Sequence, residues 1–261
     1  MNEYLNMAPS QTLKWIEEGR LPSTADVEIE GTEPYIVGGH TASGYWIDTK
    51  RRTTIAGLYA AGDAAGGCPQ KYVTGALAEG EIAAQAILED LKKLESNNNL
   101  PDNKDAFLEQ VSREKLQEVR EILEKEPGLF SIEQLEEAMQ KIMDTYAGGI
   151  SSHYQYNERQ LNLAESKIKE LLAQTKNLSA GDMHELMFLY ELKERLVVCR
   201  TLIAHLKARK ETRWNSFNEN LDYPEKDPEW MKYVNSHMED GDIKILYREL
   251  AGRREQYEHN N

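Results

Sequence analysis

The chain has 261 residues, of which 29% are charged, and a formal net charge of −14 at pH 7. The excess of acidic residues argues against nucleic acid as a partner, because a phosphate-binding surface needs an excess of Lys and Arg. The sequence contains no run of about 18 apolar residues, so it predicts no membrane-spanning helix, and no signal peptide is visible at the N-terminus. The two cysteines, Cys68 and Cys199, have no metal-ligand spacing and make no disulfide framework. Together these features favour a cytoplasmic protein.

The first part of the chain predicts a helix followed by short strands. Residues 1–24 have a helical pattern with Ser10 as a candidate N-cap. Residues 27–30 alternate like a half-buried strand, and two apolar runs within residues 33–48 flank a Gly/Ser/Thr loop that carries His40. A histidine in such a polar loop can donate a proton or pair with an anion at neutral pH.

The stretch from Gly57 to Ala86 organises this part of the chain. A short apolar run ends at Gly62 and Asp63, a loop of small residues follows, and a small-residue helix is predicted over about 74–94. The pattern predicts a strand that brings a carboxylate close to a helix N-terminus. Asp63 could accept hydrogen bonds from sugar or polyol hydroxyls, while the unpaired amides of the helix would stabilise an electron-rich group.

A polar linker at residues 96–102 marks the best domain boundary, and helices follow it. The first contains Leu116, Val119 and Leu123 on one face; a capping box of Ser131 and Gln134 opens the second. Two more helices are predicted near 157–176 and 180–209, which together predict an antiparallel bundle. Residues 211–261 are irregular, with a short strand pair around 243–247.

Two motifs in the organising stretch resemble a known family. Gly62-Asp63-Ala64-Ala65-Gly66 and Lys71-Tyr72-Val73-Thr74-Gly75 are similar to the second FAD-binding segment of the fumarate reductase/succinate dehydrogenase flavoproteins. The match is closest to the α subunits of dissimilatory adenylylsulfate reductases. The resemblance implies FAD as cofactor and a set of residues that contact it: Gly62, Asp63, Tyr72, Thr74, Gly75 and Ala76. The alternative is an ordinary strand–turn–helix unit whose glycines serve only the turn.

The resemblance also implies catalytic residues. Residues 33–40 are similar to the segment that places a histidine over the flavin in adenylylsulfate reductases, which implies a substrate-site role for His40. In the corresponding segment of fumarate reductases the histidine lies six positions before the place of His40, and this chain has Pro34 there. Lys71 stands near the place of a substrate-binding arginine of that family. Both His40 and Lys71 could instead be surface residues without a role.

A third match lies past the predicted bundle. Residues 211–214 and 221–230 are similar to family segments with Glu-Ser/Thr-Arg, Asp-Tyr/Phe-Pro and an acidic residue before Trp. Arg213 offers a bidentate guanidinium for a carboxylate or phosphate and is therefore a catalytic candidate. The other interpretation, which we favour, is a salt bridge that fixes the bundle to the flavin domain.

No Gly-x-Gly-x-x-Gly turn for a dinucleotide pyrophosphate occurs in the chain. If the resemblance holds, the chain is the C-terminal part of a longer FAD-dependent oxidoreductase, inactive and without FAD on its own. Its partners would be the missing N-terminal half, a small anionic substrate and an iron–sulfur electron-transfer subunit, which could bring it to the inner face of a membrane. The implied reaction is sulfite and AMP chemistry at flavin N5, resembling adenylylsulfate reductase.

Two alternatives remain open: hydride transfer of the fumarate reductase/succinate dehydrogenase type, and a helical interaction module without chemistry in this half. We expect an α+β, mostly helical fold. Its predicted parts are a C-terminal portion of an FAD-binding region (1–95), an antiparallel helical bundle (104–210) and an irregular tail that packs back on both (211–261).

Overall fold

A computed structural model describes residues 9–20, 24, 43–67, 73–97, 104–213 and 218–250. The chain divides into two compact units, residues 1–36 and 37–261, which we treat separately. The first unit contains helix α2 (Pro9–Glu17), which confirms the helix predicted there, and Thr12 and Trp15 on it are buried. The strands and the histidine loop predicted between residues 27 and 42 lie outside the described residues.

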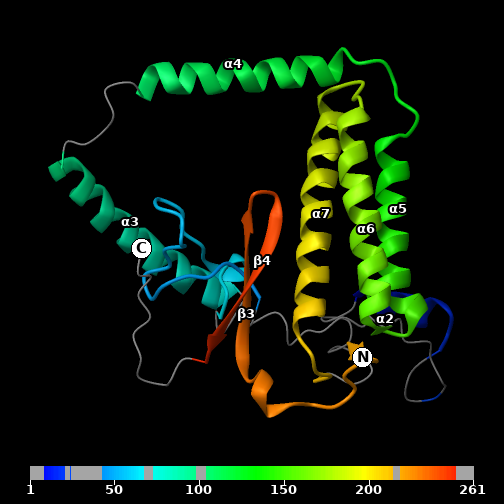
Figure 1. Ribbon diagram of the computed structural model, residues 1–261. Helices are drawn as coiled ribbons and strands as arrows, with labels where there is room; N and C mark the ends of the chain where they lie inside the picture. The colour runs from blue at the N-terminus through cyan, green and yellow to red at the C-terminus, as the bar shows by residue number, and fades with distance from the viewer. Residues whose placement is uncertain are drawn as a thin grey trace. The chain divides into compact units, whose positions relative to one another are not determined.

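The second unit begins with a loop segment and a long helix, α3 (Val73–Asn97). Single bridging pairs replace the predicted strands: Tyr45 with Ala65 in parallel, and Arg52 with Tyr59 in antiparallel orientation. The short helical turn η2 (Gly62–Ala64) then leads toward α3, which lies beside it (Figure 1). The predicted order of apolar run, Gly-Asp turn and helix is therefore present, although the run forms no regular strand.

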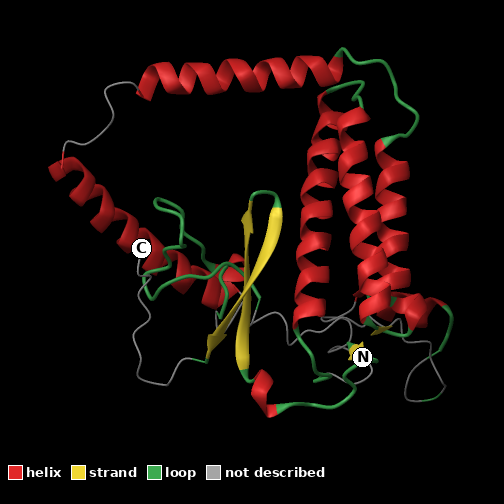
Figure 2. Cartoon of the chain, in the orientation of Figure 1, coloured by secondary structure: helices red, strands yellow, loops and turns green. Residues whose placement is uncertain are grey.

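Three helices form the main core: α5 (Ile132–Tyr146), α6 (Glu158–Gln174) and α7 (Met183–Ala208), which run side by side in Figure 2. The predicted capping box of Ser131 and Gln134 is confirmed at the start of α5. Asn157 caps α6 in the same way, and Asp182 caps α7. Their inward stripes supply the fully buried side chains, which include Leu161, Ile168, Leu189, Leu192, Leu196 and Ile203.

Helix α4 (Lys104–Leu123) departs from the predicted four-helix packing. Among the described residues, its C-terminal turns contact the bundle: the Ile122 carbonyl accepts a bond from the Ala180 amide, just before α7, at 3.3 Å, and Glu118 accepts one from the Tyr190 hydroxyl at 3.4 Å. Residues 105–117 are exposed, including large apolar side chains such as Phe107. Amphipathicity predicted the helix but not its packing: Ile122 at its C-terminal end packs against the core, whereas the apolar residues of its first three turns are exposed.

The tail is more regular than predicted. Strands β1 (Gln155–Tyr156) and β2 (Glu219–Asn220) form a short parallel pair. After the turn η5 (Pro228–Trp230), strands β3 (Lys232–Glu239) and β4 (Asp242–Glu249) form an antiparallel hairpin.

The hairpin extends the strand pair expected at 243–247 to eight residues per strand. Asp240 and Gly241 close it with positive φ angles of 51° and 80°, the backbone that a two-residue hairpin turn requires. The hairpin packs on α7, where the His205 ring lies 2.9 Å from the Ser236 hydroxyl and the Tyr247 hydroxyl donates to the Ala208 carbonyl. No described helix is long and apolar enough to cross a membrane.

Candidate functional site

The Gly-Asp turn lies directly against the first turns of α3. Gly62 has φ +63°, and a Cβ added there would lie 3.2 Å from the Cβ of Ala76. The backbone angle therefore favours glycine at this position, and the contact with Ala76 leaves little room for a side chain. Asp63 is exposed, Gly75 and Ala76 are half-buried, and Thr74 is exposed. The structure thus brings together five of the six predicted cofactor-binding positions.

A second strand-like segment holds the turn in place. The Tyr45 amide donates to the Ala64 carbonyl at 2.8 Å, and the Gly66 amide donates to the Tyr45 carbonyl at 2.9 Å. A Cβ on Gly66 would come 2.9 Å from the Tyr45 carbonyl oxygen, and one on Gly44 would come 2.5 Å from the Gly66 nitrogen. The close approach of two backbones explains these glycines, so the position of Asp63 depends on them.

The chemistry available at the turn is that of a carboxylate beside a helix N-terminus. The first backbone amides of α3 have no acceptor within the helix, and they carry the positive end of its dipole. Together with the exposed Asp63, they can bind a polar ligand that has hydroxyl groups at one end and electron-rich atoms at the other. Three predicted site residues, His40, Lys71 and Tyr72, lie outside the described residues.

Two arginines that the sequence analysis did not single out hold the loop to α3. The guanidinium of Arg51 forms a two-pronged ion pair with the nearly buried Glu79, and its Nη1 donates to the Thr49 carbonyl at 2.6 Å. Arg51 adopts a left-handed backbone with φ 67°. Arg52 makes a second two-pronged pair with Asp90, at 2.6 and 2.8 Å.

These contacts fix the charge states around Asp90. Hydrogen bonds from Arg52 hold the pKa of the Asp90 carboxyl well below its usual range, and the same contact raises the pKa of Arg52. The Tyr59 hydroxyl also donates to Asp90, at 2.7 Å, and burial together with that carboxylate raises the pKa of Tyr59. The Arg52–Asp90 pair is therefore ionised across the physiological range. Together with the Arg51–Glu79 pair it ties the loop to α3 at two points about three helical turns apart.

The third predicted motif forms a buried ion-pair cluster. The Glu211 side chain has no exposed surface; it accepts bonds from Arg213 at 2.8 Å, from Arg209 at 2.6 Å and from the Asp227 amide at 3.1 Å. Burial alone would raise the pKa of Glu211, but the bonds from Arg213, the Asp227 amide and Arg209 outweigh it and hold that pKa below its usual value. The Arg213 fork is thus engaged by Glu211, which favours the structural interpretation of this motif.

The same cluster joins the end of α7 to the tail. The Thr212 hydroxyl donates to the Tyr223 carbonyl at 2.9 Å and accepts from the Asn220 amide at 2.9 Å. Arg209 lies over the Trp230 ring at 5.8 Å. The Glu-Thr-Arg and Asp-Tyr-Pro segments that the sequence paired are therefore neighbours in space.

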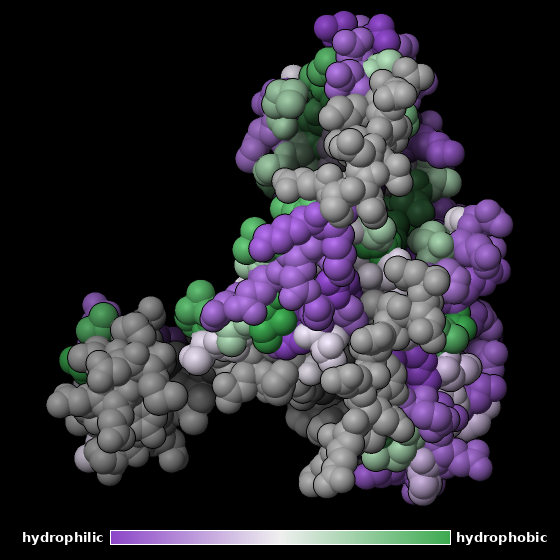
Figure 3. Space-filling view, turned by 90° about the vertical axis from the view of Figure 1, so that its left-hand side faces the viewer, coloured by the Kyte–Doolittle hydropathy of each residue, from purple (hydrophilic) through white to green (hydrophobic). Residues whose placement is uncertain are grey.

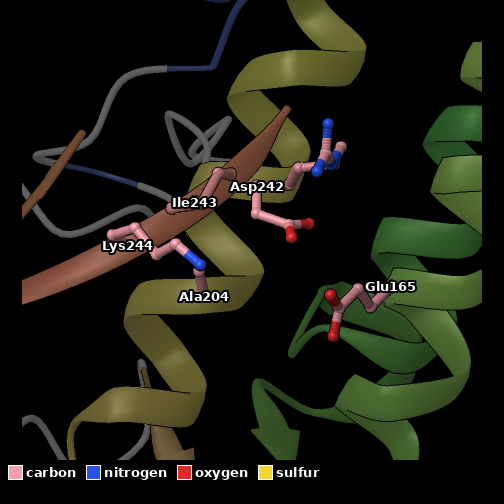
Figure 4. Close-up of a pocket in the computed structure, with 6 residues that line it drawn as sticks. Glu165, Ala204, Asp242, Ile243 and Lys244 are labelled. Carbon is pink, nitrogen blue, oxygen red and sulfur yellow. The ribbon is translucent and has the colours of Figure 1, made fainter. Parts of the chain in front are cut away.

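A cavity of about 180 Å³ lies elsewhere, between α6, α7 and β4. Its lining residues are Glu165, Arg200, Ala204, Asp242, Ile243 and Lys244. In Figure 4 the carboxylates of Glu165 and Asp242 lie on opposite sides of it. Glu165 already pairs with Lys207 at 2.7 Å and Lys169 at 2.8 Å. None of the predicted site residues lines this cavity, and no His/Cys/Asp/Glu group suited to a metal occurs in the described part of the chain.

Comparison with known proteins finds relatives over most of the chain. Residues 136–259 match the model of the family described as fumarate reductase flavoprotein C-term. The adenylylsulfate reductase α subunit of Megalodesulfovibrio gigas is 27% identical over 90% of this chain and 39% of its own length. An uncharacterized FAD-dependent oxidoreductase of Methanocaldococcus jannaschii is 28% identical over 76% of this chain and 35% of its own. A solved adenosine-5-phosphosulfate reductase in complex with sulfite, as a covalent adduct, aligns with TM-score 0.74 and 27% identity over 97% of this chain and 44% of that one.

These matches make the chain similar to one class of protein, the C-terminal part of fumarate reductase/succinate dehydrogenase flavoproteins. Within that class, the chain is similar to the α subunit of adenylylsulfate reductase, as the Gly62–Gly66 and Lys71–Gly75 motifs predicted. The mostly helical fold class is confirmed as well. The chain spans about two fifths of the length of the relatives it matches. The domain boundaries expected near residues 95–104 and 210 stay a prediction.

Proposed function

We propose that the chain is the C-terminal part of an FAD-dependent oxidoreductase in which the Gly-Asp turn and the start of α3 contact the flavin. The observation that carries the proposal is the packing of Gly62 against Ala76, which places the exposed Asp63 beside the α3 N-terminus. Gly62, Gly75 and Ala76 are small, so the backbone at these described positions leaves room for a flat ligand to come close. Similarity to an FAD-dependent oxidoreductase supports the same assignment.

In this proposal the chain binds and orients the cofactor rather than reacting. Asp63 would accept hydrogen bonds from the ribityl hydroxyls, and the α3 amides near Thr74 and Gly75 would face the pyrimidine end of the ring. FAD, when bound, supplies two-electron transfer. The proposed substrate-site groups are His40 and Lys71, whereas Arg213, which is held by Glu211, would keep the tail in place beside the site.

We propose adenylylsulfate as the substrate, with sulfite and AMP as products. The support is the similarity to two adenylylsulfate reductases, one of them solved with sulfite. In this proposal the active protein also contains the dinucleotide-binding part that the chain does not cover and receives electrons from an iron–sulfur subunit. The second candidate is fumarate or succinate chemistry, favoured by the family that residues 136–259 match.

The test uses the chain joined to its dinucleotide-binding part. We expect the purified protein to contain FAD and to reduce adenylylsulfate in preference to fumarate. Asp63→Ala should lower FAD occupancy, while Asp105→Ala, an exposed carboxylate on α4, should leave it unchanged. Reduction of fumarate alone would favour the second candidate. If the purified protein contains no flavin, both enzyme candidates are excluded and the helical interaction module is the hypothesis that remains.

A further inference from the structure

The cavity between α6, α7 and β4 is lined by charged side chains from all three elements (Figure 4). Arg200 comes from α7, Glu165 from α6, and Asp242 and Lys244 from β4. Asp242 and Lys244 lie two residues apart on the strand, so they leave it on the same side. One water molecule needs about 10–15 Å³. The cavity of about 180 Å³ therefore has room for a small ion of several atoms.

The ionic contacts around this cavity leave an excess of positive charge. Glu165 accepts bonds from Lys207 at 2.7 Å and from Lys169 at 2.8 Å, so its charge is already neutralised. Arg200 and Lys244 add two cations, and one other of the described lining residues has a carboxylate. Four basic side chains therefore stand against two acidic ones.

This excess is local, because the chain as a whole is acidic. It has 45 Asp and Glu residues against 31 Lys and Arg, and hydrophilic residues, in purple, cover much of the face that Figure 3 presents. An arbitrary polar region of such a chain is expected to be negative. A cavity whose surroundings are positive instead concentrates anions, since its walls focus the field of the cations.

Arg200 also has a hydrogen-bond donor that the described part of the chain does not use. Its Nη2 donates to the Gly241 carbonyl at 2.7 Å, which fixes one edge of the guanidinium to the hairpin turn. Its Nε is buried and has no hydrogen-bond partner among the described residues, and the described carboxylate of Asp242 makes no ion pair with Arg200. A buried donor without an acceptor is unfavourable, and the guanidinium fork fits an oxyanion. An anion with several oxygens beside Arg200 would supply the missing acceptor.

We propose that this cavity binds a small oxyanion with two negative charges, of the kind of sulfate or phosphate, between Arg200 and Lys244. The Arg200 guanidinium donates hydrogen bonds to its oxygens, and the Lys244 amine balances its second charge. Asp242 and Lys244 are exposed, so the ligand can enter from the β4 side. A free ion and the phosphate group of a nucleotide share this chemistry. The inference needs no flavin and does not depend on the proposed function.

Calorimetric titration of the whole chain with sodium sulfate, sodium phosphate or AMP tests the proposal, at an ionic strength held constant with sodium chloride. Calorimetry is preferred to a thermal shift, because sulfate and phosphate stabilise folded proteins in general. We expect saturable binding of one anion per chain. Arg200→Gln and Lys244→Gln should each weaken it at least about tenfold. Arg113→Gln, which removes the same charge at an exposed position of α4, should change it less than about twofold.

A third variant determines the sign of the ligand's charge. Asp242→Asn removes a carboxylate that repels an anion, so it should tighten the binding of sulfate by at least about threefold. A cation held between the carboxylates of Glu165 and Asp242 would respond in the opposite direction. Circular dichroism of each variant checks that it folds. If Arg200→Gln does not fold, Lys244→Gln at its exposed position still tests the site.

The nucleotide arm identifies the source of the anion. Binding of AMP but not of adenosine, with the same loss in Lys244→Gln, supports the site and assigns it to a nucleotide phosphate. Binding of sulfate and phosphate without AMP supports it and assigns it to a free ion. The proposal is overturned if the wild-type chain binds none of the three anions, if Lys244→Gln and Arg113→Gln behave alike, or if Asp242→Asn weakens binding.

Discussion

At the scale of single residues, Glu211 shows how a motif that suggests chemistry can serve structure. Its carboxylate is fully buried and accepts bonds from two arginines and one backbone amide. Such a group is difficult to remove, because the arginines would be left without their counter-charge. The Glu-Thr-Arg segment is therefore explained by the junction between α7 and the tail, without a substrate.

We predict that Glu211→Gln lowers the free energy of unfolding by about 3 kcal/mol at pH 7, since it breaks a buried ion pair. The folded-state pKa of Glu211 is depressed, so its stabilisation is present above the unfolded value, about 4.3, and is lost as the pH falls through the folded one. The difference between wild type and variant should therefore shrink in acid. Urea denaturation at pH 7 and pH 3.5 measures it, with Glu124→Gln as an exposed control. A difference independent of pH would contradict the argument.

Two glycines, Gly62 in the turn and Gly80 in α3, should respond in opposite directions to the same substitution. Gly62→Ala forces a side chain into a left-handed backbone and against Ala76, which should cost about 1–2 kcal/mol. Gly80→Ala fills open space in a helix and should gain about 1 kcal/mol. The Tm of this chain should fall by a few degrees in the first case and rise by about 2–4 °C in the second. A stabilising Gly62→Ala would show that the turn does not have this geometry.

At the scale of elements, the sequence predicted contacts between neighbouring residues well, but it did not predict contacts between residues that are far apart in the chain. The capping box of Ser131 and Gln134 lies within four residues, so the sequence alone predicts the start of α5. The ion pair of Arg51 and Glu79 joins residues 28 apart, and the chain offers many acidic residues for each arginine. The hairpin was only partly predicted, although Asp240-Gly241 is a strong turn signal between two alternating runs.

The position of α4 could not be predicted, for a related reason. Its apolar positions predict that one face is buried, but the covering element is not specified by the stripe itself. The same holds for the turn at Gly62: the residue type predicted a turn, while the contact with Ala76 depends on where α3 packs. The sequence therefore predicted the geometry of the site only where residues that are close in the sequence form it.

We predict that residues 104–210 fold alone, because α5, α6 and α7 form one core with short connections. Far-UV circular dichroism of this fragment should show a cooperative loss of helix on heating. Leu189→Ala, at a fully buried position, should lower stability by about 2–5 kcal/mol. Leu116→Ala, on the exposed face of α4, should change it by less than about 0.5 kcal/mol. A non-cooperative melt would mean that the bundle needs the rest of the chain.

At the scale of the whole molecule, the chain is similar to about two fifths of the length of its flavoprotein relatives. The chain holds a turn and a helix end suited to a flavin, but its sequence lacks a Gly-x-Gly-x-x-Gly turn. We therefore predict that this chain alone binds FAD weakly or not at all, because few contacts remain to offset the entropy lost on binding. Fluorescence titration with FAD measures the affinity. Purification of the chain with stoichiometric flavin would contradict the prediction.

In the proposed function, His40, which lies outside the described residues, belongs to the substrate site and can be used to distinguish the candidate substrates. In the complete protein, a histidine at the substrate would stabilise negative charge as the sulfur–oxygen bond changes. Loss of one such donor typically costs about 10²–10³ in rate, so His40→Ala should slow adenylylsulfate reduction by about that factor. His40→Gln keeps a neutral donor and should recover part of the rate.

The same variants discriminate between the two enzyme candidates. If the complete protein reduces fumarate, the family histidine is replaced by Pro34, and His40→Ala should barely affect fumarate turnover. Steady-state rates with both substrates, measured for wild type, His40→Ala and His40→Gln at equal FAD content, give the comparison. If His40→Ala keeps adenylylsulfate reduction within about threefold of wild type, its effect on the barrier is below about 1 kcal/mol, and His40 has no part in the mechanism.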